Sequence, residues 1–285
     1  MGLGFIRLWL LTLGIAGARA AYDDASARST LRYAEAAYCP DTRVQKWDCD
    51  ACHAVPQFAV ETVLSVPAHD THGFVGHDAR ADKIVVSFRG TDPLKLDAWL
   101  VDLKSAVLDD YSACSGCKVG HGFLGAFVEV RNKTLDAVSR LSSRHPAATM
   151  LITGHSLGGA YATLLAAELL LAHRKLTMIT YGQPRIGNAA FASTLDKRLA
   201  ATGSTSWRLV HYADPVPHLP PEVLDFRHVS PEVHYDELNR HYQVCDGSGE
   251  DPQCADGIAV PLLITDPMTY FGISLVKSFL ACNLR

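Results

Sequence analysis

The chain has 285 residues, of which 48% are hydrophobic and 20% are charged, and this is ordinary globular composition. Its net charge is −4 with no block of lysine or arginine, so the sequence gives no support to a nucleic-acid partner. No segment beyond the first 20 residues is apolar enough over about 20 residues to span a bilayer, so we expect no transmembrane segment.

Residues 1–20 have the three parts of a signal peptide. Arg7 is the basic element, Leu8–Ile15 is the apolar core, and Ala18-Arg19-Ala20 is a small-x-small cleavage site. The apolar core is too short to cross a membrane, which makes a membrane anchor the weaker alternative. We therefore expect a secreted, extracellular protein whose mature part, residues 21–285, is one domain, because about 265 residues are common for one α/β domain.

Hydrophobic periodicity predicts helices and strands that alternate along the chain. In chain order these are a helix at 26–38, strands at 58–66 and 83–88, a helix at 123–141, a strand at 150–153, a helix at 156–172, a strand at 178–181, a helix at 189–199 and a strand at 207–212. Such alternation predicts an α/β fold with a largely parallel sheet and helices on both faces. Functional side chains then belong at the carboxyl ends of the strands.

A serine lies where the predicted strand at 150–153 turns into the following helix. The segment reads Gly154-His155-Ser156-Leu157-Gly158-Gly159. A Gly-x-Ser-x-Gly sequence alone is common in loops, but a strand before it and a helix after it are the context of a nucleophile elbow. This context predicts Ser156 as the nucleophile of an ester hydrolase that forms an acyl-enzyme.

The partners of such a serine have candidates in the sequence. Asp214 follows the last predicted strand and comes after Ser156, as the triad acid does in this kind of fold, although an Asp-Pro pair also commonly starts a turn. The oxyanion hole needs two backbone N–H groups, which Leu157 and Thr91 would supply. The alternative for Thr91 is that Gly90-Thr91 is an ordinary turn after a strand.

Taken together, these segments resemble the class 3 lipases, the secreted fungal triacylglycerol lipase type, a family that also includes feruloyl esterases. The matching segments, in the order of the family, are Ser87-Phe88-Arg89-Gly90-Thr91, His121-Gly122-Phe123, Gly154 to Gly159, Tyr181 to Asn188, Asp214-Pro215-Val216-Pro217 and Tyr270-Phe271-Gly272. The resemblance implies an α/β-hydrolase fold with Ser156 as nucleophile, Asp214 as acid, and Thr91 and Leu157 as oxyanion donors. It also implies a lipid or ester substrate, met at a lipid–water interface, and acylglycerol is the substrate class we favour.

The resemblance implies that a short helical lid follows Thr91, within residues 92–103. Leu94, Leu96 and Trp99 would form the apolar underside of this lid. The alternative, which the sequence does not separate from a lid, is a fixed helix that packs Trp99 into the core.

The sequence departs from the family at the catalytic base. The family has its histidine three residues before the Tyr-Phe-Gly segment, and this chain has Pro267 there. Proline cannot accept or donate a proton, so we expect strongly impaired activity, with about 10³- to 10⁴-fold acceleration over water remaining. The alternatives are a catalytically silent relative, a shifted register, or another histidine in the role, for which the histidines after Asp214 are His218, His228, His234 and His241.

Eight cysteines lie in the mature part, and an even number behind a signal peptide predicts disulfide bonds. Cys49-x-x-Cys52 and Cys114-x-x-Cys117 could instead be zinc ligand pairs, but secretion argues against zinc. The resemblance implies disulfides Cys39–Cys282 and Cys114–Cys117, which leaves Cys49–Cys52 and Cys245–Cys254.

A few further features are weak signals. Asn132-Lys133-Thr134 is an acceptor sequence for N-glycosylation. His69, His72 and His77 match no known ligand spacing, so we expect them in surface loops and predict no metal. We also expect no cofactor and a monomeric protein.

Overall fold

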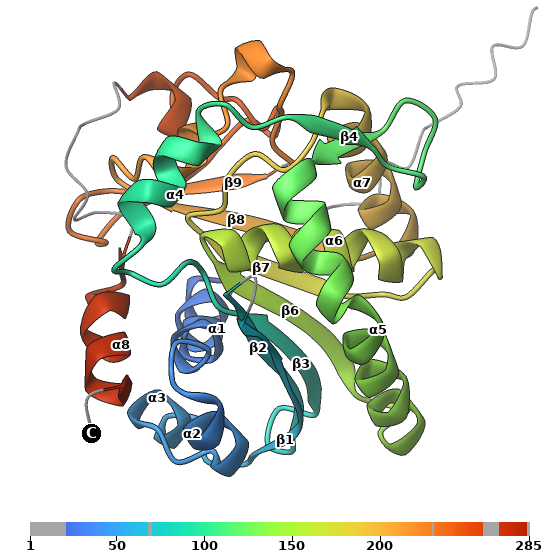
Figure 1. Cartoon of the computed structure of the whole chain (residues 1–285), viewed down its shortest axis with the longest axis vertical. Coiled ribbons are helices and arrows are strands. Elements are labelled where there is room, and N and C mark those ends of the chain that lie inside the picture. The colour runs from blue at the N-terminus through green and yellow to red at the C-terminus, as the bar shows by residue number, and fades with distance from the viewer. Residues whose placement is uncertain (1–20, 68–69, 230, 259–267, 284–285) are drawn as a thin grey trace, which may run out of the picture.

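The computed structural model describes residues 21–67, 70–229, 231–258 and 268–283, and an eight-stranded sheet crosses it (Figure 1). In spatial order the strands are β1 (Phe58–Val66), β2 (Thr71–Asp78), β3 (Lys83–Phe88), β6 (Thr149–His155), β7 (Thr177–Tyr181), β8 (Thr205–His211), β9 (Glu232–Tyr235) and β10 (Tyr242–Val244). Strands β3, β6, β7, β8 and β9 pair in parallel, while β1, β2 and β10 are antiparallel to their neighbours. The predicted largely parallel sheet is therefore confirmed.

Helices cover both faces of this sheet (Figure 1). One face carries α5 (His121–Arg144), α6 (Leu157–Leu171) and α7 (Ala189–Thr202), and the other carries α1 (Asp24–Ala36), α2 (Asp41–Lys46), α3 (Asp50–His53) and α8 (Leu275–Asn283). Successive residues of a strand point to opposite faces, so Val85 of β3 packs with the second group and Val86 with the first. No helix within the described residues is long and apolar enough to cross a membrane.

The remaining elements lie outside the main sheet. They are α4 (Leu96–Leu103), short 3-10 helices at Val216–His218, Glu222–Leu224 and Ala255–Gly257, and two ribbons, β4 (Leu108–Asp110) with β5 (Lys118–Gly120) and β11 (Thr269–Tyr270) with β12 (Ile273–Ser274). Helix α4 lies at the end of the sheet where β8 and β9 finish (Figure 1). Helix α6 is apolar on all sides and almost wholly buried, which is typical of a helix packed between a sheet and other helices.

The sequence located five strands of the main sheet and the helices α1, α5, α6 and α7, but it missed the helices α2, α3 and α8 and the strands β9, β10 and β2. Strand β2 shows the reason. His72 and His77, which we expected in surface loops, lie on this strand, and His69 lies outside the described residues. Strand β2 contains glycine, histidine and aspartate in place of a β-branched run, and it is held by pairing with both β1 and β3. His72 Nδ1 lies 3.1 Å from an Asp41 carboxylate oxygen, and His77 Nε2 lies 3.0 Å from one of Asp82.

Candidate active site

Ser156 lies on a sharp turn between β6 and α6. Its φ of 53° and ψ of −124° are strained for a residue with a side chain, which is the geometry of a nucleophile elbow. The end of β3 passes close to this turn, since a Cβ on Gly158 would stand only 2.2 Å from the carbonyl oxygen of Phe88. The hydroxyl of Ser156 is buried and makes no hydrogen bond to a described residue.

The loop after β3 lies directly against this elbow. A Cβ on Gly90 would stand 2.7 Å from the carbonyl oxygen of His155 and 3.0 Å from Cβ of Ser156. The next residue, Thr91, is buried, and its hydroxyl has no hydrogen-bond partner among the described residues. Leu157 is the first residue of α6, where backbone N–H groups have no partner within the helix and the helix dipole is positive. The structure thus brings the loop that carries Thr91 against Ser156, beside Leu157 at the start of α6.

Asp214 lies at the same end of the sheet as Ser156. It follows β8, while Ser156 follows β6, and β7 lies between these parallel strands. Its side chain is fully buried, with Oδ1 accepting from the N–H of Val216 at 2.9 Å and Oδ2 from the hydroxyl of Tyr270 at 2.8 Å. Asp214 Oδ2 and His155 Nε2 both lie within 3.5 Å of the point where a Cβ on Gly182 would stand, which brings Asp214 close to the elbow.

Two tyrosines of this site were not singled out from the sequence. Tyr270 belongs to the C-terminal motif, and burial together with the charge of Asp214 raises the pKa of Tyr270 well above its usual value, so its hydroxyl remains a donor. Tyr38 lies next to Cys39, and its hydroxyl oxygen lies 2.6 Å from Nδ1 of His155. Neither contact could be predicted from the sequence, because each joins residues more than fifty positions apart.

The histidine candidates for the missing base lie in other surroundings. His228 Nε2 donates to the carbonyl oxygen of Pro217 at 2.7 Å, and His234 Nε2 lies 2.8 Å from that of Tyr212. His218 Nε2 is buried without a hydrogen-bond partner among the described residues, and His241 is exposed. Burial, with a smaller contribution from Arg208, lowers the pKa of His228 well below its usual value. Pro267 itself lies outside the described residues.

The lid candidate is helix α4, and the structure corrects one of its predicted residues. Leu96 is buried and Trp99 is half-buried against two parts of the core, which both a lid and the alternative of a fixed helix require, so the lid stays a prediction. Leu94 is 80% exposed, so its place on the underside was wrong, because it precedes the helix on a turn that faces solvent. A cavity of about 380 Å³ lies beneath α4, and both Trp99 and Leu157 line it.

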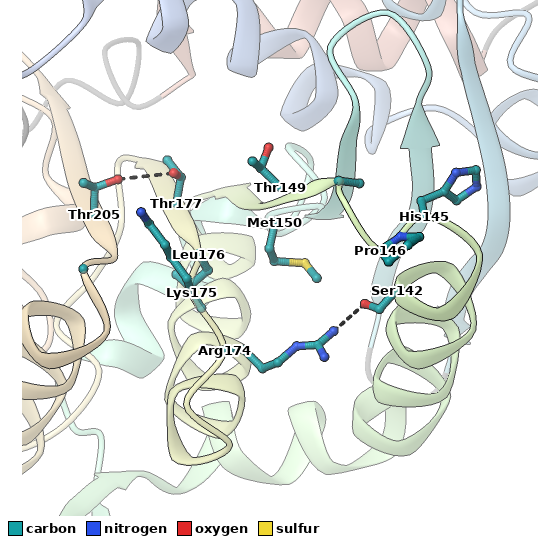
Figure 2. A pocket seen from close by; sticks show the side chains of 12 residues that line it. Ser142, His145, Pro146, Thr149, Met150, Arg174, Lys175, Leu176, Thr177 and Thr205 are labelled. Atoms are coloured by element: carbon teal, nitrogen blue, oxygen red, sulfur yellow. Dashed lines mark hydrogen bonds between the residues drawn. The ribbon is translucent and has the colours of Figure 1, made fainter.

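A larger cavity, of about 750 Å³, lies away from this site (Figure 2). Thr149 and Thr177, at the first residues of β6 and β7, line it, and Arg174 crosses it to donate to the hydroxyl of Ser142. Ser156 and Asp214 lie at the opposite, carboxyl ends of the strands. The larger cavity is therefore not the candidate active site.

All eight cysteines are paired in the structure. The disulfides are Cys39–Cys282, Cys49–Cys52, Cys114–Cys117 and Cys245–Cys254. The first and third are the pairs that the resemblance implied, and the other two are the pairs that it left over. Because all eight cysteines are bonded, no thiol is left for the zinc alternative. Asn132 is exposed on α5, where a glycan could be attached. Glycosylation at this residue stays a prediction.

Comparisons with known proteins agree with this geometry. Residues 85–224 match the family described as lipase (class 3). A secreted mono- and diacylglycerol lipase of Fusarium solani is 36% identical over 257 residues, which are 86% of this chain and 74% of that protein. A lipase of Rhizomucor miehei is 34% identical over 80% of this chain, and the chain spans 62% of its length.

A solved structure supplies the comparison of folds. It is that of a triacylglycerol lipase whose catalytic centre is described as a serine protease triad. The TM-score is 0.80 at 31% identity, and the match covers 89% of this chain and 96% of that one. This likeness confirms the predicted α/β-hydrolase fold. Shared fold, ordered motifs and identity over most of both sequences together show that the chain belongs to the class 3 lipase family.

Proposed function

We propose that the chain is a secreted carboxylic ester hydrolase that acts on acylglycerols at a lipid–water interface through Ser156. The observation that carries the proposal is the strained elbow at Ser156, beside the loop of Thr91 and the N-terminus of α6. The relative from Fusarium solani is named a secreted mono- and diacylglycerol lipase, which supports both secretion and this substrate class.

Each side chain has a separate role in this proposal. The Ser156 oxygen attacks the ester carbonyl, and the N–H groups of Thr91 and Leu157 stabilise the negative charge that develops on the carbonyl oxygen. The ester C–O bond breaks and the alcohol leaves with the proton that Ser156 gave up. Water then hydrolyses the acyl-enzyme, which releases the acid and restores the hydroxyl of Ser156. Asp214, held by Tyr270, would orient the base and stabilise its charged form.

The proposed mechanism lacks a catalytic base at the position where the family has one. Pro267 stands where the family has its histidine, and the hydroxyl of Ser156 makes no hydrogen bond to a described residue. Without a base to take its proton, a serine hydroxyl is a poor nucleophile. We therefore propose that turnover is slow. A feruloyl-type esterase and a non-catalytic lipase-like binding protein are the alternatives that experiments have to separate from this proposal.

A fluorophosphonate probe tests whether the site is catalytic. Such a probe forms a covalent bond with an activated serine, and we expect slow labelling of Ser156 that is lost in Ser156→Ala. Mass spectrometry of the labelled peptide is the measurement. No labelling after long incubation would favour the binding protein, while rapid labelling would mean that another base is at work and would contradict the proposed impairment.

The lid predicts how the substrate must be presented. If α4 covers the site through Leu96 and Trp99, hydrolysis of an emulsified long-chain ester should exceed that of soluble short-chain esters. We expect Trp99→Ala to reduce this preference, because it removes apolar surface between α4 and the cavity. The exposed Leu94→Ala is the matched control. Equal rates on emulsified and soluble esters, with feruloyl esters preferred, would favour the feruloyl-type esterase.

A further inference from the structure

The loop that follows Asp214 is held in place by hydrogen bonds to its backbone carbonyl oxygens. The carbonyl oxygens of residues 217–220 all accept hydrogen bonds from just two residues, Arg185 and His228. The contacts are Pro217 with His228 Nε2 at 2.7 Å, His218 with Arg185 Nη1 at 2.8 Å, Leu219 with the N–H of Arg185 at 2.8 Å, and Pro220 with Arg185 Nη1 at 3.3 Å. Asp214 depends on this loop, because its Oδ1 accepts from the N–H of Val216.

Glu250 holds both of these donors. Arg185 is only 3% exposed, and a buried guanidinium needs a carboxylate partner. Glu250 supplies a bidentate pair, with Oε1 2.9 Å from Nε and Oε2 2.6 Å from Nη2 of Arg185. The same Oε1 accepts from the backbone N–H of His228 at 2.8 Å. One carboxylate therefore fixes the side chain of Arg185 and the main chain of His228.

Other acidic residues do not duplicate this contact. Glu222 and Asp256 lie 3.5 Å and 3.3 Å from Nη2 of Arg185, and neither has a close contact with its Nε. Glu250 itself lies on a loop closed by Cys245–Cys254, whose Gly249 carbonyl accepts from Arg208 at 3.0 Å. The carboxylate is thus anchored, and it lies beyond residues 85–224, the part that matches the family.

We propose that Glu250 is a positioning residue for the catalytic acid, which holds Asp214 in place through Arg185, His228 and the loop at 217–220. The proposal rests on the proposed function only in that Asp214 is the acid. If Glu250 loses its charge, the guanidinium of Arg185 and the main chain of His228 loosen, and the carbonyls of Pro217, His218 and Pro220 lose their donors. Val216 then moves with the carboxylate that it binds.

The test compares Glu250→Gln with Glu61→Gln. Glu61 is a matched control, because its side chain is 17% exposed against 15% for Glu250, and it also pairs with arginine, on β1. The first measurement is amide hydrogen exchange by NMR at Val216, His218 and Leu219, relative to amides of β3, which carries neither substitution. The second is kcat and KM in a Pro267→His background.

We expect Glu250→Gln to speed exchange at these three amides at least tenfold and to lower kcat at least tenfold, with KM changed less than twofold. Exchange as slow as in Glu61→Gln would overturn the proposal. Faster exchange with unchanged kcat would show that Glu250 holds the loop but that the position of Asp214 does not limit catalysis. It would overturn the claim that Glu250 positions a catalytic acid. An inactive Pro267→His background would count against the proposed function, and exchange would still decide whether Glu250 holds the loop. If Glu250→Gln does not fold, Glu250→Asp keeps the charge but is too short for the bidentate pair, and a smaller change in the same direction is expected.

Discussion

Replacing Pro267 with histidine is expected to raise the rate of ester hydrolysis at least tenfold. The rest of the proposed machinery is present, since Ser156, the loop of Thr91 and Asp214 lie together at one end of the sheet. An imidazole at position 267 would supply the group that takes the proton of Ser156. A tenfold gain corresponds to about 1.4 kcal/mol in the activation barrier, and general-base catalysis typically contributes about 10²- to 10⁴-fold.

Controls separate base chemistry from other effects of removing a proline. Pro267→Ala removes the ring without adding a base, so it should leave the rate near that of the unmodified chain. The gain from histidine should disappear in the double variant with Ser156→Ala. It should also grow as pH rises through about 6.5, because only neutral imidazole accepts a proton. A gain below tenfold, or an equal gain from Pro267→Ala, would show that Pro267 is not the defect.

Local patterns predicted the parts of the site that lie within single motifs. Ser156 follows a buried strand and precedes an apolar helix, and Asp214 follows a parallel strand that finishes at the same end of the sheet. Periodicity alone therefore placed both at one edge. Thr91 follows β3, and the turn at Gly90 between them lies against the elbow at Ser156. In each case the neighbours in sequence determine where the residue lies.

Features that depend on distant contacts could not be predicted in this way. Strand β2 is held because β1 and β3 pair with both of its edges, while glycine, histidine and aspartate interrupt the strand-forming residues that it has. Tyr270 donates to Asp214 across 56 positions, and Glu250 pairs with Arg185 across 65. Leu94 looked like part of an apolar underside, but the helix begins only at Leu96, so the face of Leu94 is set by the preceding turn.

These distant contacts bear on the two ends of the chain in particular. Tyr38, beside the end of α1, contacts His155 of the elbow, and the neighbouring Cys39 is bonded to Cys282 of α8. Cys39 and Cys282 lie in the part of the core that α1, α3 and the strands β1, β2 and β3 share. The segment just after α1 is thus linked by a disulfide to the last described helix, α8, and by a hydrogen bond to the elbow.

Removing the disulfide Cys39–Cys282 is therefore expected to destabilise the protein more than removing Cys114–Cys117. A disulfide stabilises the fold mainly by restricting the unfolded chain, and its effect grows with the length of chain that it closes. The first bond joins residues 243 positions apart and the second residues 3 positions apart. Loop-closure entropy gives about 5 kcal/mol for the long loop and about 2 kcal/mol for the short one.

The free energy of unfolding in urea, measured for Cys39→Ala/Cys282→Ala and for Cys114→Ala/Cys117→Ala, checks this prediction. Alanine is chosen because Cys39, Cys282 and Cys117 are buried, and a serine hydroxyl there would add the cost of an unpaired polar group. We expect the first variant to lose about 3 kcal/mol more than the second. Equal losses would contradict the entropic account and would mean that local packing around each pair, including Tyr38 beside Cys39, determines what each disulfide contributes.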